Sequence, residues 1–177
     1  MASFARLEII IFALLACNTI YYLVAGRFSE TLESVAWYAL LILFLLETRE
    51  PRLAQSALAR AALRAMRLLA TLAIAMSMAL YVREKEWLDA TNLLLWIAVV
   101  ALLEFEVWRP AAIATQRTAY TLAAAALYAG LGILVLVWLA LGKWLNAWDA
   151  ALWLAAFGLL EINILKKLNT KISFKNI

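Results

Sequence analysis

Six apolar blocks follow one another along the chain, and they constrain its fold more than any other feature. They cover about residues 7–25, 32–46, 63–82, 88–108, 120–141 and 148–165. Most approach the roughly 20 residues that a helix needs to cross about 30 Å of hydrocarbon. The second block is short, because only Val35 to Leu46 lacks charged residues, so we expect it to include flanking residues. The blocks predict six membrane-spanning segments.

The composition indicates that these segments are helices in lipid. The 177-residue chain is 67% hydrophobic and 16% charged, whereas a soluble domain is about half apolar and about a quarter charged. So few polar side chains cannot cover the water-exposed surface of a soluble globule of this size. The blocks are rich in Leu and Ala and do not alternate in polarity, which favours helices over a β-barrel. We therefore predict an all-α, polytopic transmembrane helical bundle that forms a single transmembrane domain.

The distribution of Lys and Arg predicts the orientation. With six spans, both termini lie on one side of the membrane, and that side carries twelve of the sixteen basic residues. The four on the opposite side are Arg27, Arg83, Lys85 and Lys143. The positive-inside rule then places both termini in the cytoplasm, which is typical of a bacterial inner-membrane protein. This bias also explains the sequence pI of about 9.4 without a nucleic-acid partner.

An internal repeat divides the chain into three parts. Three Leu-Leu-Glu segments recur at equal intervals along the chain, and a basic residue follows each glutamate five positions later. The glutamates are Glu47, Glu104 and Glu161, and the basic residues are Arg52, Arg109 and Lys166. The pattern predicts three helical hairpins, about 1–57, 58–114 and 115–168, followed by a loosely held, basic cytoplasmic tail at 169–177. Either a pseudo-threefold bundle or a sequential row of hairpins fits this pattern.

The repeated glutamates have two interpretations. Each lies near the predicted cytoplasmic end of a span, and its basic residue at i+5 is about 140° away around the helix, so we expect an ion-pair partner on another helix. Arg64 and Arg67 are candidate partners for the first glutamate. In the structural interpretation, the carboxylates lock neighbouring hairpins together. In the alternative, they face a common axis and handle protons or cations. Their position near the membrane boundary favours the structural interpretation.

Two other groups of polar residues are candidate contact sites. Arg60, Arg64 and Arg67 fall on one helical face, where they could bind anionic lipid headgroups or an acidic partner, although ordinary positive-inside topology also accounts for them. Asn18 lies inside the first span, and we expect it to form an interhelical hydrogen bond.

The sequence gives little support for catalysis. It has no histidine and a single cysteine, which removes the commonest general base, most zinc sites and any iron–sulfur site. We therefore expect no enzyme activity, cofactor or metal. Two classes of function are left. One is a non-catalytic accessory subunit that packs against lipids and other integral membrane proteins, with a homo-oligomer also possible. The other is a small transporter or channel that uses Glu47, Glu104 and Glu161 as proton or cation groups.

Overall fold

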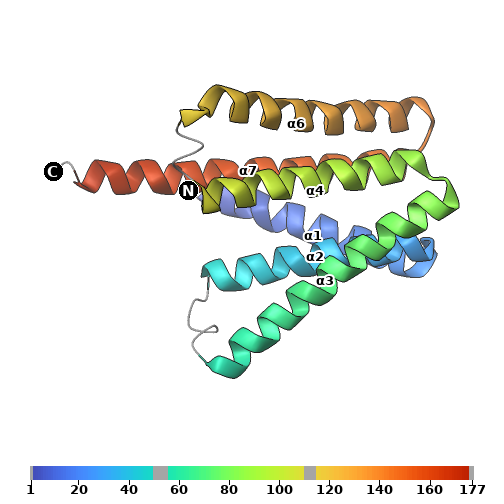
Figure 1. Cartoon of the computed structure of the whole chain (residues 1–177), viewed down its shortest axis with the longest axis horizontal. Helices are drawn as coiled ribbons and strands as arrows, with labels where there is room; N and C mark the ends of the chain where they lie inside the picture. The colour runs from blue at the N-terminus through green and yellow to red at the C-terminus, as the bar shows by residue number, and fades with distance from the viewer. Residues whose placement is uncertain (1, 50–55, 110–114, 176–177) are drawn as a thin grey trace. The chain divides into compact units, whose positions relative to one another are not determined.

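The chain is all-helical in the computed structural model, which describes residues 2–49, 56–109 and 115–175, with side chains at 6–47, 56–105, 108–109 and 115–159. The structure confirms the predicted all-α class, and Figure 1 shows the helices in chain order. In this described part there are six helices: α1 (Ala2–Ala25), α2 (Phe28–Arg49), α3 (Ala57–Glu84), α4 (Trp87–Trp108), α6 (Arg117–Ala140) and α7 (Trp144–Lys175).

Five of these helices are long and apolar enough to cross a membrane. The candidate spans are Arg6–Ala25, Phe28–Glu47, Ala57–Glu84, Trp87–Phe105 and Arg117–Ala140. The second span includes residues on both sides of the short apolar block, as expected. The sixth expected span, 148–165, falls on α7 and reaches beyond the described side chains, which end there at Leu159.

The last helix is longer than the sequence analysis predicted. α7 continues through Lys175, so the backbone of residues 169–175, in the expected tail, is helical. The cytoplasmic location of this tail stays a prediction. No Pro or Gly follows Gly158 in the sequence, and an established helix gains one hydrogen bond for each residue that it adds. The helix therefore continues past the end of the expected span.

The described chain forms two compact units, one of which is Ala16–Leu94. In this unit, α2 and α3 pack along each other. Ser29 contacts Glu84, Glu33 contacts Tyr81 and Glu47 contacts Arg67, so the two helices run antiparallel. This unit therefore has two ends. We call the end with the α1–α2 and α3–α4 turns the turn end, and the end with Glu47 and Arg67 the opposite end.

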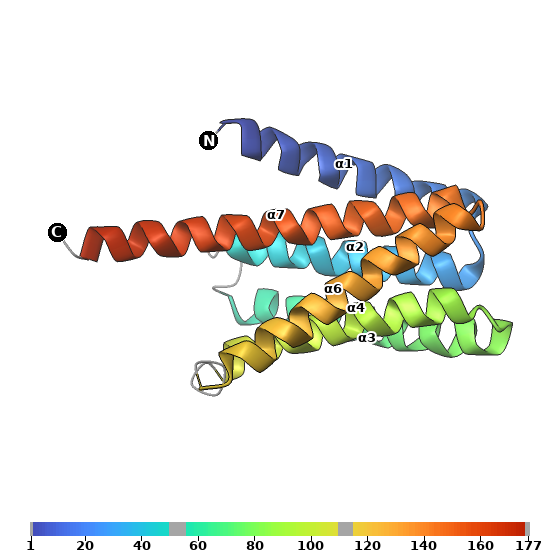
Figure 2. The ribbon, with the colours of Figure 1, turned by 90° about the horizontal axis from the view of Figure 1, so that it is seen from above.

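The other unit consists of Met1–Leu15 and Leu95–Ile177. In it, α6 packs along α7, and Figure 2 shows the turn that joins them. An aromatic group contributes to its core, because the ring centroid of Phe157 lies 4.8 Å from that of Trp96 and 6.4 Å from that of Trp153. Gly130 of α6 leaves room for a side chain of α4, since a Cβ at this position would lie 3.3 Å from the side chain of Leu95.

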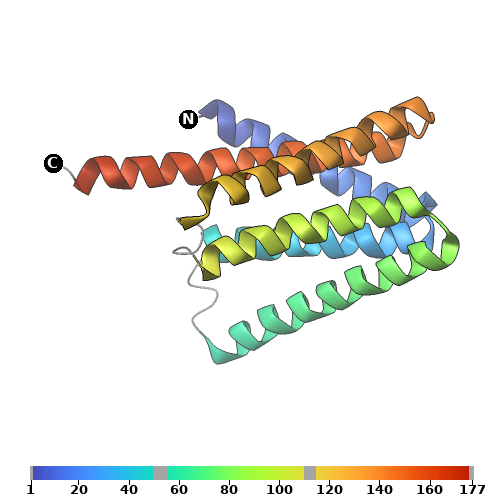
Figure 3. The ribbon, with the colours of Figure 1, turned by 45° about the horizontal axis from the view of Figure 1, so that its top comes forward.

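Two of the turns have the same hydrogen bonds. After α3, the N–H of Glu86 donates to the carbonyl of Tyr81 at 2.9 Å, and after α6 the N–H of Lys143 donates to the carbonyl of Trp138 at 2.9 Å. The residue before each donor is left-handed, with φ of 61° at Lys85 and 71° at Gly142. These are Schellman-type helix ends. The interval between them equals the interval of the predicted repeat, and Figure 3 shows both turns.

The α1–α2 turn does not follow this register. The N–H of Gly26 donates to the carbonyl of Tyr22 at 2.9 Å, and α2 starts at Phe28. The start of α4 at Trp87 and the repeat interval together predict a later start for α2. The observed α2 therefore begins earlier than the repeat predicts. Glu47 is therefore two residues further along its helix than Glu104 is along α4. The threefold hairpin architecture stays a prediction. The two turns that match each other lie in its second and third hairpins.

Candidate functional site

The candidate site is built around Arg27, in the short turn between α1 and α2. Gly26 makes this turn possible, because a Cβ there would lie 2.6 Å from the carbonyl oxygen of Tyr22. The carbonyl of Arg27 accepts from the N–H of Thr31 at 2.9 Å, and its N–H donates to the Glu30 carboxylate at 2.8 Å. Arg27 is thus the N-cap of α2, and Glu30 satisfies the orphan N–H as the glutamate of a capping box does. The turn holds the Arg27 backbone in place.

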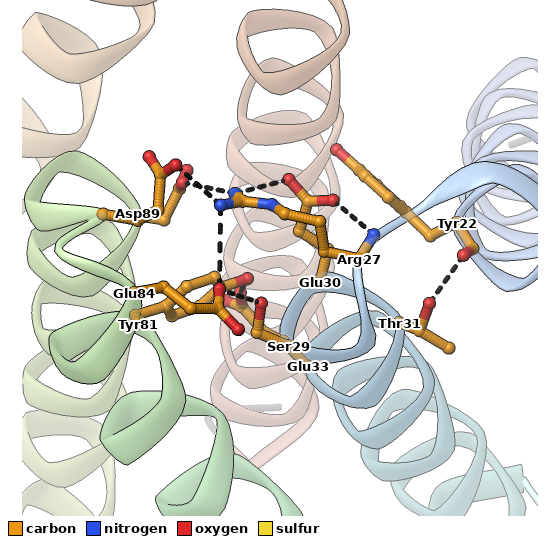
Figure 4. A network of polar contacts seen from close by, with 10 residues as sticks. Tyr22, Arg27, Ser29, Glu30, Thr31, Glu33, Tyr81, Glu84 and Asp89 are labelled. Carbon is orange, nitrogen blue, oxygen red and sulfur yellow. Dashed lines mark hydrogen bonds and ion pairs between the residues drawn. The ribbon is translucent and has the colours of Figure 1, made fainter.

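The Arg27 guanidinium joins this turn to the turn between α3 and α4. Its Nη2 lies 2.8 Å from Glu30 and 3.2 Å from Asp89, and its Nη1 lies 2.7 Å from Glu86 and 3.6 Å from Glu84. We call these five residues the Arg27 cluster, and Figure 4 shows it from close by. The cluster therefore ties together two turns that are distant in the sequence.

Helix starts explain why carboxylates gather here. Glu30 is the third residue of α2 and Asp89 is the third residue of α4, positions where the helix macrodipole favours a negative charge. Asp89 is buried at 4% exposure, so its contact with Arg27 compensates the cost of removing a charge from water. Glu84, at the unfavourable C-terminal end of α3, accepts a hydrogen bond from the buried Ser29 hydroxyl at 2.8 Å.

Further polar contacts continue from the cluster along α1, α2 and α3. The Tyr81 hydroxyl, on a side chain that is buried in α3, donates to Glu33 of α2 at 2.5 Å. Between α1 and α2, the hydroxyl of Ser34 donates to that of Thr19 at 3.1 Å, and both residues are buried. These contacts join neighbouring helices, which is the usual role of hydroxyl groups between membrane helices.

The electrostatics of the cluster favour a permanently charged guanidinium. The hydrogen bond to Glu30 raises the pKa of Arg27 above its ordinary value; desolvation opposes this increase, and the carboxylate charges of Glu30, Glu86 and Asp89 add to it. One positive charge faces four carboxylates, so the cluster is acidic overall. Among the described residues, no group of three or more His, Cys, Asp or Glu side chains has an arrangement that could hold a metal ion.

The repeated glutamates lie elsewhere. Glu47 is half-buried and forms an ion pair with Arg67 of α3, which is one of the two partners that the sequence suggests. Glu104 is exposed on α4. The side chain of Glu161 lies outside the described residues, as do Arg52 and the side chain of Lys166, while Arg109 is exposed just after α4. A common axis for the three glutamates stays a prediction.

The remaining candidates divide between surface and core. Arg60, Arg64 and Arg67 are all exposed along the first three turns of α3. Asn18 is buried in α1, beside the Thr19 that accepts from Ser34 of α2. The structure therefore places Asn18 next to an interhelical polar contact.

Sequence reasoning missed the Arg27 cluster because it counted Arg27 only as a basic residue for topology. A signal was present. Five of the twelve acidic residues lie within two short segments, 30–33 and 84–89, that flank predicted turns on the same side of the membrane. Such a concentration of carboxylates beside three basic residues, Arg27, Arg83 and Lys85, predicts an ion-pair cluster.

Comparison with known proteins gives no relative. No family model, curated protein or solved structure matches this chain.

Proposed function

We propose that the chain is a non-catalytic accessory subunit of a bacterial inner membrane, with both termini in the cytoplasm, that packs against lipids and other integral membrane proteins. The observation that carries the proposal is the Arg27 cluster. Each of its carboxylates contacts the same guanidinium, and that guanidinium joins two turns. An arrangement in which every carboxylate contacts the same guanidinium of the chain supports a structural role more than a site for a substrate.

The other polar contacts support the same role. The Glu47–Arg67 pair and the Thr19–Ser34 hydrogen bond each join two helices of one unit. Polar groups inside or near a bilayer commonly connect helices in this way. The chain also contains no histidine, which is the side chain most often used in proton transfer.

The surface of α6 supports a protein partner. The small residues Ala123, Ala126 and Ala129 are exposed on this helix, and small side chains let another helix approach its backbone closely. Of the five candidate spans, α6 also buries the smallest share of its residues. A second membrane protein, packed on this face, would cover it.

The test is purification of the tagged, full-length protein from its native membrane in a mild detergent, followed by native mass spectrometry. We expect a fixed stoichiometry with one or more other integral membrane proteins. Ala126→Leu, on exposed α6, should reduce their recovery at least about tenfold, which corresponds to about 1.4 kcal/mol. The matched control is Ala75→Leu, on an exposed position of α3, which should leave recovery unchanged. Recovery of a monomer or a homo-oligomer alone would contradict the proposal.

The transport alternative has its own test. In proteoliposomes, Glu47→Gln, Glu104→Gln and Glu161→Gln should abolish proton or cation flux if these carboxylates are transport groups. The accessory-subunit proposal expects no flux above empty liposomes, for the unmodified chain and for all three variants. Flux that the three substitutions remove would replace the proposal with the transport function.

A further inference from the structure

The helix α3 is longer than a bilayer requires. Its 28 residues correspond to about 42 Å, against about 30 Å of hydrocarbon. Its last residues, Arg83 and Glu84, are charged and mark one boundary of the apolar segment. Counting about 20 residues back from there reaches Leu63. If α3 spans a bilayer, this count puts its first two turns, from Ala57, at the level of the lipid headgroups.

This part of α3 is a formed helix with one basic face. The side chain of Ser56 accepts from the N–H of Ala59 at 3.0 Å and caps the helix start. Arg60, Arg64 and Arg67 follow at i, i+4 and i+7, within about 60° of one another around the axis, and all three are exposed. The first turn contains no acidic residue. The helix therefore presents the three arginines on one exposed face.

The charge on this face is only partly compensated within the chain. Glu47 pairs with Arg67, whereas Arg64 has no acidic partner in the part of the chain that the structure describes. The other side of the same turns exposes apolar side chains, Leu58 at 81% and Met66 at 50% exposure. An amphipathic segment at headgroup depth places its guanidinium groups beside phosphates and its apolar groups beside acyl chains.

We propose that Arg60 and Arg64 bind the phosphate of anionic phospholipid headgroups in the leaflet next to the start of α3. Guanidinium groups suit this ligand because their planar donors match the geometry of phosphate oxygens. The inference deepens the lipid-packing part of the proposed function and rests on it, but it does not depend on a protein partner.

The test measures lipid binding to the purified full-length protein. Native mass spectrometry with added phosphatidylglycerol or phosphatidylcholine gives the affinity for each lipid. We expect tighter binding of phosphatidylglycerol. Each arginine near a lipid surface contributes about fivefold, so the double variant Arg60→Gln/Arg64→Gln should bind phosphatidylglycerol about 30-fold more weakly. Binding of phosphatidylcholine should change by less than about twofold.

Two further variants separate charge from fold. Arg60→Lys/Arg64→Lys keeps both charges and should recover most of the preference for phosphatidylglycerol. Arg83→Gln/Lys85→Gln removes two charges at the other end of α3 and should leave the affinity within about twofold of the original. Circular dichroism checks that each variant keeps its helical content.

Two results would overturn the inference. One is an unchanged affinity for phosphatidylglycerol in Arg60→Gln/Arg64→Gln. The other is a variant that keeps this affinity but loses a co-purifying membrane protein, because the basic face would then bind an acidic protein. Either result is compatible with the accessory-subunit proposal. A purified monomer that binds phosphatidylglycerol would contradict that proposal but would support the lipid site.

Discussion

The two ends of the 16–94 unit use the same kind of contact in different ways. At the turn end, one guanidinium contacts four carboxylates, and one of these, Asp89, is buried. At the opposite end, one arginine contacts one glutamate, and the side chains of Arg67 and Glu47 are 48% and 30% exposed. The two ion-pair sites have similar residue types, but they differ in the burial of their side chains and in the number of partners.

The difference indicates which end fixes the helices. An exposed ion pair contributes about 0–1 kcal/mol, because water and salt screen it and two flexible side chains lose freedom. Removing one partner of a buried pair costs several times more, because a charge is left without compensation. We therefore expect the turn end to determine how the α1–α2 and α3–α4 turns are held together, and the opposite end to add little.

Arg27→Gln should have the largest effect among substitutions of the ion-pairing side chains in this unit. It leaves four carboxylates close together without their common cation. The free energy of unfolding should fall by about 2–3 kcal/mol, which is less than the roughly 3–5 kcal/mol of a fully buried pair because the Arg27 side chain is 38% exposed. Unfolding in mixed micelles would measure it, with the exposed Arg83→Gln as control. A change below about 0.5 kcal/mol would show that the two ends do not differ.

Tyr81→Phe should have the next largest effect. It removes the hydroxyl that donates to Glu33 at 2.5 Å and keeps the ring in place. Loss of a hydrogen bond to a charged group costs about 1.5–3 kcal/mol, and we expect about 1.5 kcal/mol here because Glu33 is half-buried. Tyr21→Phe, at an exposed aromatic position, serves as the control and should change stability little. Equal effects of the two substitutions would mean that the Glu33 contact contributes nothing.

Lys85→Gly tests whether the stability of the turn end depends on the backbone conformation of the turn as well as on charge. Lys85 has φ of 61°, a left-handed conformation that glycine adopts without the Cβ penalty. We expect a gain of about 0.5–1 kcal/mol in unfolding free energy. Gly142→Ala, at the matching position with φ of 71°, should lose about 1 kcal/mol. If Lys85→Gly destabilises the protein, the lysine charge contributes more than the strain of the turn.

Glu47→Gln should have the smallest effect, about 0.5 kcal/mol, because its partner Arg67 is exposed. A double-mutant cycle with Arg67→Gln isolates the coupling energy, which should disappear at about 1 M salt. The loss caused by Arg27→Gln should persist at this salt concentration, since part of its cluster is buried. A coupling energy above about 2 kcal/mol would mean that the ion pair at the opposite end stabilises the unit as much as the Arg27 cluster does.

Much of the fold follows from periodicity and composition alone. The apolar blocks predicted the helices because lipid requires long, continuous apolar segments with internal hydrogen bonds. The extension of α7 to Lys175 was missed, because sequence polarity marks where a span leaves the membrane and says little about where a helix stops. The offset at the α1–α2 turn was also missed, since the spacing of the glutamates does not reveal where α2 starts.

The candidate site was less predictable. The pairing of Glu47 with Arg67 was one of two options, because helical geometry excluded the i+5 residue as its partner. The Arg27 cluster requires two turns that are distant in the sequence to meet, and no local pattern specifies that meeting. Asp89, the third residue of α4, contacts Arg27 across this gap in sequence.

The most direct test of the central claim, that Arg27 holds the two turns together, is a distance measurement between them. Spin labels at Phe28→Cys and Trp87→Cys, both exposed positions, would be placed in a Cys17→Ser background in liposomes. Double electron–electron resonance should give one narrow distance distribution, which broadens in Arg27→Gln and is unchanged in Arg67→Gln. An equally narrow distribution in Arg27→Gln would contradict the account, because the turns would then be held by other contacts.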